Sequence, residues 1–238
     1  MCDVCGCGDP RLAPRVSIDV NASLLADNDA EAAHLREHFV AHGITALNVM
    51  GSPGSGKTAL LEATARALAG SARLAAVSGD LATSLDAERL ERAGIPCTTI
   101  TTGSACHLDA SMIHHALHGD ARAAVERCAF FFIENVGNLV CPAIYDLGQR
   151  ARVVVLSVTE GVDKPLKYPV MFRRADLVVL TKIDLLPHLP GVSTAALRDN
   201  IAITRPGLPV LELSATTGQG VDAWVDWLRS QSQLGIRG

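Results

Sequence analysis

A glycine-rich segment at residues 51–58 restricts the fold of this chain more than any other feature. Its sequence is Gly-Ser-Pro-Gly-Ser-Gly-Lys-Thr, and it lies between an apolar run at residues 46–50 and a helical pattern that begins near Lys57. Glycine accepts the backbone angles of a tight turn between a strand and a helix. The segment therefore predicts a strand, a turn and a helix in direct succession, as in an α/β fold.

The remainder of the chain continues to alternate strands with helices. Short apolar runs predict strands at residues 46–50, 74–78, 97–101, 129–133, 153–158, 177–180 and 210–213. Amphipathic patterns predict helices that begin near Lys57, Ser84, Leu108, Thr194 and Val221. Because the strands are continuously apolar, both of their faces are buried. We therefore expect a mostly parallel sheet covered by helices on both faces.

Composition and apolar pattern also indicate the domain organisation. Residues 1–14 are rich in Gly, Cys and Pro, and we expect a flexible, metal-binding tail there. Residues 15–238 are expected to form one domain, with a first helix around residues 27–42 whose apolar face includes Leu35 and Phe39.

Composition excludes several classes of protein. The hydrophobic content of 48% is ample for a core, and the formal net charge of −4 argues against nucleic acid as a partner. No uncharged apolar run reaches the roughly 18 residues of a membrane span, and the amino terminus does not resemble a signal peptide. We expect a cytoplasmic protein, in which the seven cysteines do not form a disulfide framework.

The glycine-rich segment has the spacing and the context of a Walker A loop. Backbone N–H groups of such a loop surround phosphates, Lys57 is expected to bridge the β- and γ-phosphates, and Thr58 to bind Mg²⁺. The residues expected at the phosphates are Gly51, Gly54, Ser55, Gly56, Lys57, Thr58 and Ala59.

The base is predicted to be guanine. Thr181-Lys182-Ile-Asp184 follows a strand, and the carboxylate of Asp184 can accept hydrogen bonds from N1–H and the exocyclic amine of guanine. Adenine has an unprotonated N1 at that place, so the same carboxylate disfavours it. Lys182 is expected to pack over the base, and Ser214-Ala215 to offer a backbone N–H to guanine O6.

A third group of residues is expected near the γ-phosphate. Glu134 should hold Mg²⁺ through water, and the N–H of Gly137 should sense the γ-phosphate. Asp80 and Asp86 are further carboxylates, and either could bind Mg²⁺ or position water, although Asp86 could equally complement a helix dipole. Asn138 stands where fast GTPases have Gln, which predicts slow hydrolysis. The residues expected to be catalytic are Lys57, Asp80 and Glu134.

Two groups of soft ligands suggest metal binding. Cys2, Cys5 and Cys7 cluster near the terminal amine, a donor set that suits nickel, although free surface thiols are the alternative. Cys106-His107 and Cys141 follow two predicted strands at the nucleotide end of the sheet, with a helix-capping histidine and buried thiols as the alternative. Cys97 and Cys128 are expected to be inert, and the histidine rows of two helices to be solvated. These rows are His34, His38 and His42, and His114 and His118.

With these motifs identified, the chain closely resembles the hydrogenase nickel-incorporation GTPases of the HypB family. The resemblance includes Cys-x-x-Cys-Gly-Cys at residues 2–7, the Walker A loop, and Gly-Asp-Leu-Ala-Thr-Ser-Leu-Asp-Ala-Glu at residues 79–88. Its most specific strings are Cys-His-Leu-Asp at residues 106–109 and Glu-Asn-Val-Gly-Asn-Leu-Val-Cys-Pro at residues 134–142.

The resemblance implies a SIMIBI-type P-loop GTPase that delivers nickel during [NiFe]-hydrogenase maturation. It implies GTP-promoted homodimerisation, high nickel affinity in the tail, and a weaker nickel or zinc site at Cys106, His107 and Cys141. The partners it implies are a companion zinc-binding maturation protein and the hydrogenase large subunit. A related accessory GTPase for urease, a P-loop small-molecule kinase and a passive metal buffer are the alternatives.

Overall fold

A computed structural model describes residues 15–80, 83–103 and 105–233. The strands are β1 (Thr45–Met50), β2 (Leu74–Asp80), β3 (Cys97–Thr101), β4 (Phe130–Glu134), β5 (Ala151–Ser157), β6 (Leu177–Thr181) and β7 (Val210–Glu212). The α-helices are α1 (Arg15–Ala41), α2 (Lys57–Leu68), α3 (Leu85–Arg92), α4 (Ala110–His118), α5 (Arg122–Val125), α6 (Lys164–Lys167), α7 (Pro169–Arg174), α8 (Thr194–Thr204) and α9 (Val221–Gln233). Short 3₁₀ helices are η1 (Cys141–Ala143), η2 (Val158–Glu160) and η3 (Ile183–His188).

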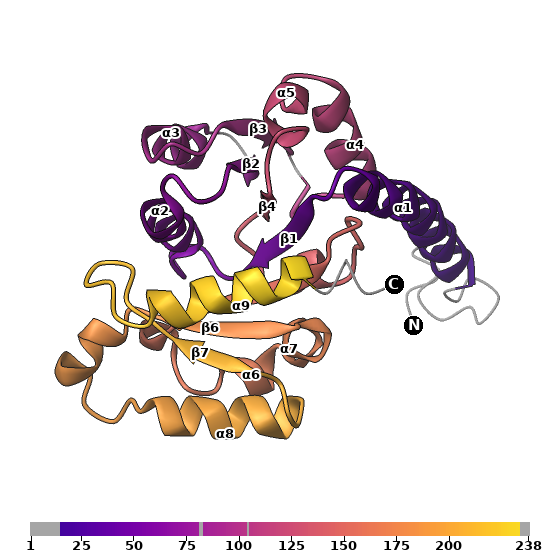
Figure 1. Cartoon of the computed structure of the whole chain (residues 1–238). Coiled ribbons are helices and arrows are strands. Elements are labelled where there is room, and N and C mark those ends of the chain that lie inside the picture. Colours follow the sequence, from indigo (N-terminus) through magenta and orange to yellow (C-terminus); the bar gives the residue numbers. More distant parts are fainter. Residues whose placement is uncertain (1–14, 81–82, 104, 234–238) are drawn as a thin grey trace, which may run out of the picture.

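The described strands form one sheet in the order β3-β2-β4-β1-β5-β6-β7 (Figure 1). Each pair of neighbouring strands in it is parallel, which confirms the expected α/β class with a parallel sheet. Because parallel strands run the same way, their carboxyl ends meet at one edge. Glu134, the last residue of β4, lies there between Val49 of β1 and Ser78 of β2.

Alternate residues of each central strand enter different layers of core. In β4, Phe130 and Phe132 pack with residues of α2, α3 and α9, whereas Phe131 and Ile133 pack with α1 and α4. The other half of that second face is covered by α7 and α8. Helices therefore cover both faces, as the continuous apolar strands predict.

The first helix is longer than the sequence indicates. It runs over Arg15–Ala41, whereas the sequence predicts a helix around residues 27–42, so the helix begins twelve residues earlier than expected. The predicted apolar face is confirmed, since Leu35 and Phe39 are buried against the sheet. Helix α1 carries only a weak amphipathic pattern, and nothing in that pattern marks its first turn.

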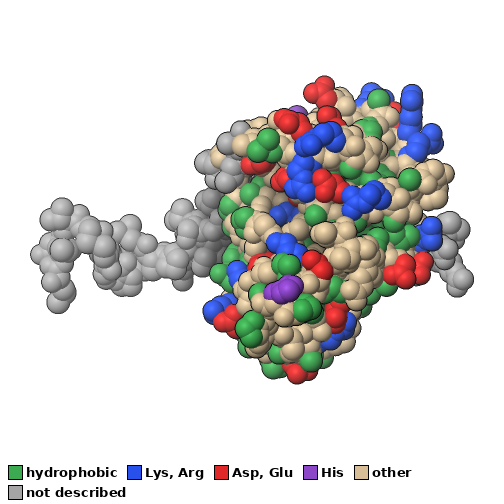
Figure 2. Space-filling view, turned by 90° about the vertical axis from the view of Figure 1, so that its left-hand side faces the viewer, with side chains coloured by type: hydrophobic (Ala, Val, Ile, Leu, Met, Phe, Trp, Pro, Cys, Tyr) green, Lys and Arg blue, Asp and Glu red, His purple; other side chains and the backbone are tan. Residues whose placement is uncertain are grey.

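Charged side chains of both signs are interspersed over the face shown in Figure 2. Along the part of the chain that the structure describes, none of the helices combines the length and the apolar character needed to cross a bilayer.

Candidate nucleotide and metal site

The glycine-rich loop joins β1 to α2 in a conformation that depends on its glycines. Gly56 immediately precedes α2 with φ of 98°, in the left-handed region that favours glycine. A Cβ on Gly51 would lie 2.3 Å from the carbonyl oxygen of Val155, so any side chain there would displace the loop. Such a loop leaves backbone N–H groups directed toward a phosphate at the helix amino terminus.

Lys57 lies folded back over this loop. Its ammonium group donates to the carbonyl oxygens of Ser52, at 3.3 Å, and Gly51, at 3.5 Å. Burial lowers the pKa of Lys57, although the charge of Glu134 opposes this effect. These two hydrogen bonds to carbonyl oxygens are long. A buried ammonium that has only such partners is suited to bind an anion such as a phosphate.

Glu134 faces Thr58 across the carboxyl edge of the sheet. The Thr58 hydroxyl donates to Oε1 of Glu134 at 2.7 Å, and Oε2 is buried without a hydrogen-bond partner among the described residues. Burial raises the pKa of Glu134 to about 7, while the Thr58 hydrogen bond and the charge of Lys57 act in the opposite direction. A hydroxyl and an unsatisfied carboxylate oxygen side by side are the hard donors that Mg²⁺ requires.

Replacing Glu134 by Gln is expected to stabilise the protein, free of nucleotide and metal, at alkaline pH. The pKa of Glu134 is raised from 4.5 to about 7, so the folded state keeps a proton that the unfolded chain has lost. Stability is therefore lost as the pH rises through this window. The full shift corresponds to about 3 kcal/mol.

Urea unfolding at pH 5 and pH 8 measures this effect. The variant should gain much more over the wild type at pH 8 than at pH 5, while the exposed control Glu37→Gln should change little at either pH. An equal gain at both pH values would contradict the account.

A cavity of about 510 Å³ opens over these groups. Among the sequence-predicted residues, those that line it are Gly54, Gly56, Lys57, Thr58, Ala59, Asp80, Asp86, Glu134, Gly137 and Lys182. Ser55 is fully buried, and Gly51 lies behind the loop against β5. The phosphate, γ-phosphate and base motifs therefore contribute residues to a single cavity.

Two residues with polar side chains that were not expected at the site also line the cavity, Arg89 and Asn135. Arg89 donates to both carboxylate oxygens of Glu62, at 2.9 and 3.0 Å, and to Asp86 at 3.4 Å. Asp86 is therefore both in the first turn of α3 and at the cavity. The i,i+3 spacing of Asp86 and Arg89 on α3 is a signal in the sequence that could have found this arginine.

The loop after β6 is attached directly to the phosphate loop. The Thr181 hydroxyl donates to the carbonyl oxygen of Ser55 at 2.6 Å, and Lys182 donates to that of Gly54 at 2.7 Å. Lys182 adopts φ of 59°, the left-handed conformation that is unusual for a residue with a side chain. Asp184, Ser214 and Ala215 follow β6 and β7 but do not line the 510 Å³ cavity.

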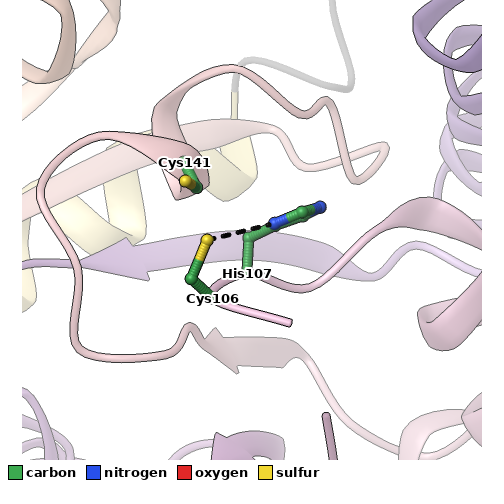
Figure 3. A group of neighbouring side chains, drawn as sticks. All are labelled: Cys106, His107 and Cys141. Carbon is green, nitrogen blue, oxygen red and sulfur yellow. Dashed lines mark hydrogen bonds between the residues drawn. The ribbon is translucent and has the colours of Figure 1, made fainter. Parts of the chain in front are cut away.

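Cys106, His107 and Cys141 come together beside this cavity, from the loop before α4 and the start of η1 (Figure 3). Their donor atoms lie within 4.8 Å of one another, and each residue is half-buried. A hydrogen bond with Cys106 raises the pKa of Cys141, and burial lowers the pKa of His107. Neutral imidazole is the form that binds metal, and two thiols with one imidazole suit nickel or zinc.

Tyr145 supports this cluster from one side. Its ring stacks on that of His107 with centroids 3.8 Å apart, which fixes the plane of the imidazole.

The other cysteines lie outside this cluster. Burial raises the pKa of Cys97 and of Cys128 to about 12, as inert thiols require. The predicted tail ligands Cys2, Cys5 and Cys7 lie outside the described residues.

The segment between Glu134 and Cys141 touches both the phosphate loop and the metal loop. Asn138 forms an isolated β-bridge with Gly51, and its side chain accepts the N–H of Val140 at 2.8 Å. Asn135 accepts the N–H of Leu108 at 3.1 Å, next to His107. A shift of this segment would therefore move both loops.

These features define a P-loop nucleotide-binding protein with a cluster of soft ligands at the edge of its nucleotide cavity. A family model described as the CobW/HypB/UreG nucleotide-binding domain matches residues 45–212. The chain is 47% identical to hydrogenase maturation factor HypB of Rhizobium leguminosarum bv. viciae, over 98% of this chain and 77% of that protein. It is 45% identical to the HypB of Cupriavidus necator, over 92% of this chain and 71% of that protein.

A solved structure, described as HypB from Helicobacter pylori in complex with nickel, has the same fold. It matches with a TM-score of 0.82 and 38% identity, over 89% of this chain and 98% of that one. The chain belongs to the HypB family of hydrogenase maturation factors, within the CobW/HypB/UreG P-loop GTPases, which confirms the family indicated by the sequence motifs.

Proposed function

We propose that this protein is a GTP-hydrolysing nickel metallochaperone for [NiFe]-hydrogenase maturation, in which nucleotide state controls metal affinity. The observation that carries the proposal is the short segment from Glu134 to Cys141. It begins at the nucleotide cavity, pairs with Gly51 of the phosphate loop, and ends in the Cys106/His107/Cys141 cluster.

For hydrolysis, the residues of the cavity have distinct roles. Lys57 leaves the loop carbonyls to bind the β- and γ-phosphates, and Thr58 with Glu134 would hold Mg²⁺. When bound, this ion neutralises charge that develops on the phosphates. Asp80 or Asp86 positions water. Oδ1 of Asn138 accepts the N–H of Val140, which restrains this side chain and is in keeping with the slow turnover that we expect.

For delivery, the cluster offers three donors to a metal that prefers four. A second copy of the chain or a partner protein can complete the set, in keeping with a GTP-dependent homodimer. Cys2, Cys5 and Cys7 would capture nickel first, and the inner cluster would hold nickel or zinc. The proposed recipients are the companion zinc-binding maturation protein and the hydrogenase large subunit.

A P-loop small-molecule kinase and an accessory GTPase for urease are the rival functions. Competition between nucleotides separates the kinase from the present proposal, since ATP should fail to displace labelled GTP. Release of phosphate from GTP in the absence of any acceptor molecule supports a hydrolase. Restoration of hydrogenase activity, and not of urease activity, in cells that lack their own maturation GTPase would identify the client.

Replacing Lys57 by Ala is expected to abolish hydrogenase maturation in such cells. The substitution removes the ammonium that binds the phosphates, while the metal cluster is left intact. Hydrogenase activity measures the outcome, with Lys167→Ala as a control on an exposed ion pair with Asp163. Full maturation by Lys57→Ala would instead favour a passive metal buffer that binds nucleotide only for stability.

A further inference from the structure

Helices α1 and α4 lie side by side, and each carries a pair of histidines one turn apart (Figure 1). The rings of His38 and His42 on α1 are 4.2 Å apart, and those of His114 and His118 on α4 are 4.4 Å apart. From the sequence alone, these histidines are expected to form separate solvated rows. The fold brings them to one seam, where His118 and His42 are exposed and His38 and His114 are half-buried.

A carboxylate holds one of these rings. Nδ1 of His114 contacts Oε1 of Glu31 across the seam. Partial burial and the charges of His118 and His115 lower the pKa of His114, whereas the adjacent carboxylate of Glu31 favours the charged ring. With Nδ1–H donating to Glu31, Nε2 of His114 is the ring nitrogen left for another ligand. Histidines that bind metals typically donate their second ring nitrogen to a carboxylate in this way.

The helices also couple His38 to His118. Burial and the neighbouring charges of His42, His118 and Arg122 lower the pKa of His38, whereas Glu126 raises it. Arg122 and Glu126 are paired with each other at 2.8 Å. His38 on α1 and His118 on α4 are therefore close enough to interact electrostatically across the seam.

We propose that His114 and His118, with Glu31 orienting His114, form a second binding site for a late first-row divalent cation such as Ni²⁺. Two histidines at i,i+4 on one helix face can bind the same ion. Unlike the cluster at Cys106, this site offers imidazoles as its ligands, which suit a six-coordinate ion whose other ligands are water.

The position of the site relates it to the thiol cluster. Helix α4 begins at Ala110, three residues after His107. His114 and His118 therefore lie about 6 and 12 Å further along that helix. An ion held weakly there would be close to the inner cluster without occupying it.

Nickel titration of the full chain with all five candidate metal-binding cysteines replaced by serine tests the proposal. Equilibrium dialysis of this cysteine variant should detect one bound equivalent of Ni²⁺. His114→Ala/His118→Ala should lower its affinity at least about tenfold, or 1.4 kcal/mol. His115→Ala is the matched control, because its ring turns back to the carbonyl of Ser111 on the same helix. Equal affinity in the double variant and the control would overturn the proposal.

A second measurement needs no cysteine substitution. Square-planar thiolate nickel is diamagnetic, whereas six-coordinate imidazole nickel is paramagnetic. In the wild-type chain, Ni²⁺ added beyond the thiol sites should broaden the ring resonances of His38, His114 and His118 before that of His188. Equal broadening of all the histidine ring resonances, or no broadening, would contradict this site. Such a result would leave the proposed GTP-dependent function unaffected.

Discussion

Replacing Asp184 by Asn is expected to change the base preference of this protein from guanine to xanthine. The carboxylate is expected to accept from N1–H and from the exocyclic amine of guanine, whereas an amide offers one acceptor and one donor. The donor repels the amine of guanine but matches the C2 carbonyl of xanthine. With two charge-assisted hydrogen bonds disturbed, we expect GTP affinity to fall by about a hundredfold or more.

Competition binding with GTP and xanthosine triphosphate measures this change. Thr181 and Lys182 anchor the same loop to the phosphate loop, so the loop itself should remain in place. Asp199→Asn, an exposed substitution on α8, is the control and should leave GTP affinity unchanged. Undiminished GTP affinity in Asp184→Asn would show that another residue reads the base.

Replacing Cys106 or Cys141 by Ser is expected to abolish tight metal binding at the inner cluster. Each substitution exchanges a soft thiolate for a hydroxyl in a set of three donors that lie within 4.8 Å. Loss of groups that only support metal ligands costs up to about a hundredfold in affinity, so loss of a ligand should cost at least that much.

The tail cysteines must be replaced by serine in this experiment, so that only the inner cluster is titrated with Ni²⁺ or Zn²⁺. Cys97→Ser is the matched control, because its half-buried thiol lies outside the cluster and its pKa is raised to about 12. If Cys141→Ser bound metal as tightly as Cys97→Ser, the cluster would not be the inner metal site.

Much of this fold could be predicted from the sequence because its strands are buried on both faces. Continuous apolar runs such as residues 130–133 stand out from the amphipathic helices on either side. The order of the strands in the sheet could not be predicted in this way. The order β3-β2-β4-β1-β5-β6-β7 depends on which strands pair in the folded chain, and that pairing leaves no local pattern in the sequence. The start of α1 was missed for a related reason, because its weak apolar period does not mark a boundary.

The candidate site likewise has a part that could be predicted from the sequence and a part that could not. The Walker A loop and Thr181-Lys182-Ile-Asp184 are local motifs, and their chemistry can be recognised from spacing alone. The approach of Cys141 to Cys106 depends on the packing of two loops, so the sequence left a helix-capping His107 as an open alternative. Arg89 and Asn135 were missed because their significance arises from what the fold places beside them.

The central claim is that nucleotide state and metal affinity are coupled through residues 134–141. By linkage, metal and nucleotide must alter each other's affinity by the same factor. The most direct test is the nickel affinity of the inner cluster with GDP and with a non-hydrolysable GTP analogue, in the wild type and in Cys141→Ala. The account predicts different affinities in the wild type and no difference in Cys141→Ala. Equal affinities with the two nucleotides in the wild type would contradict it.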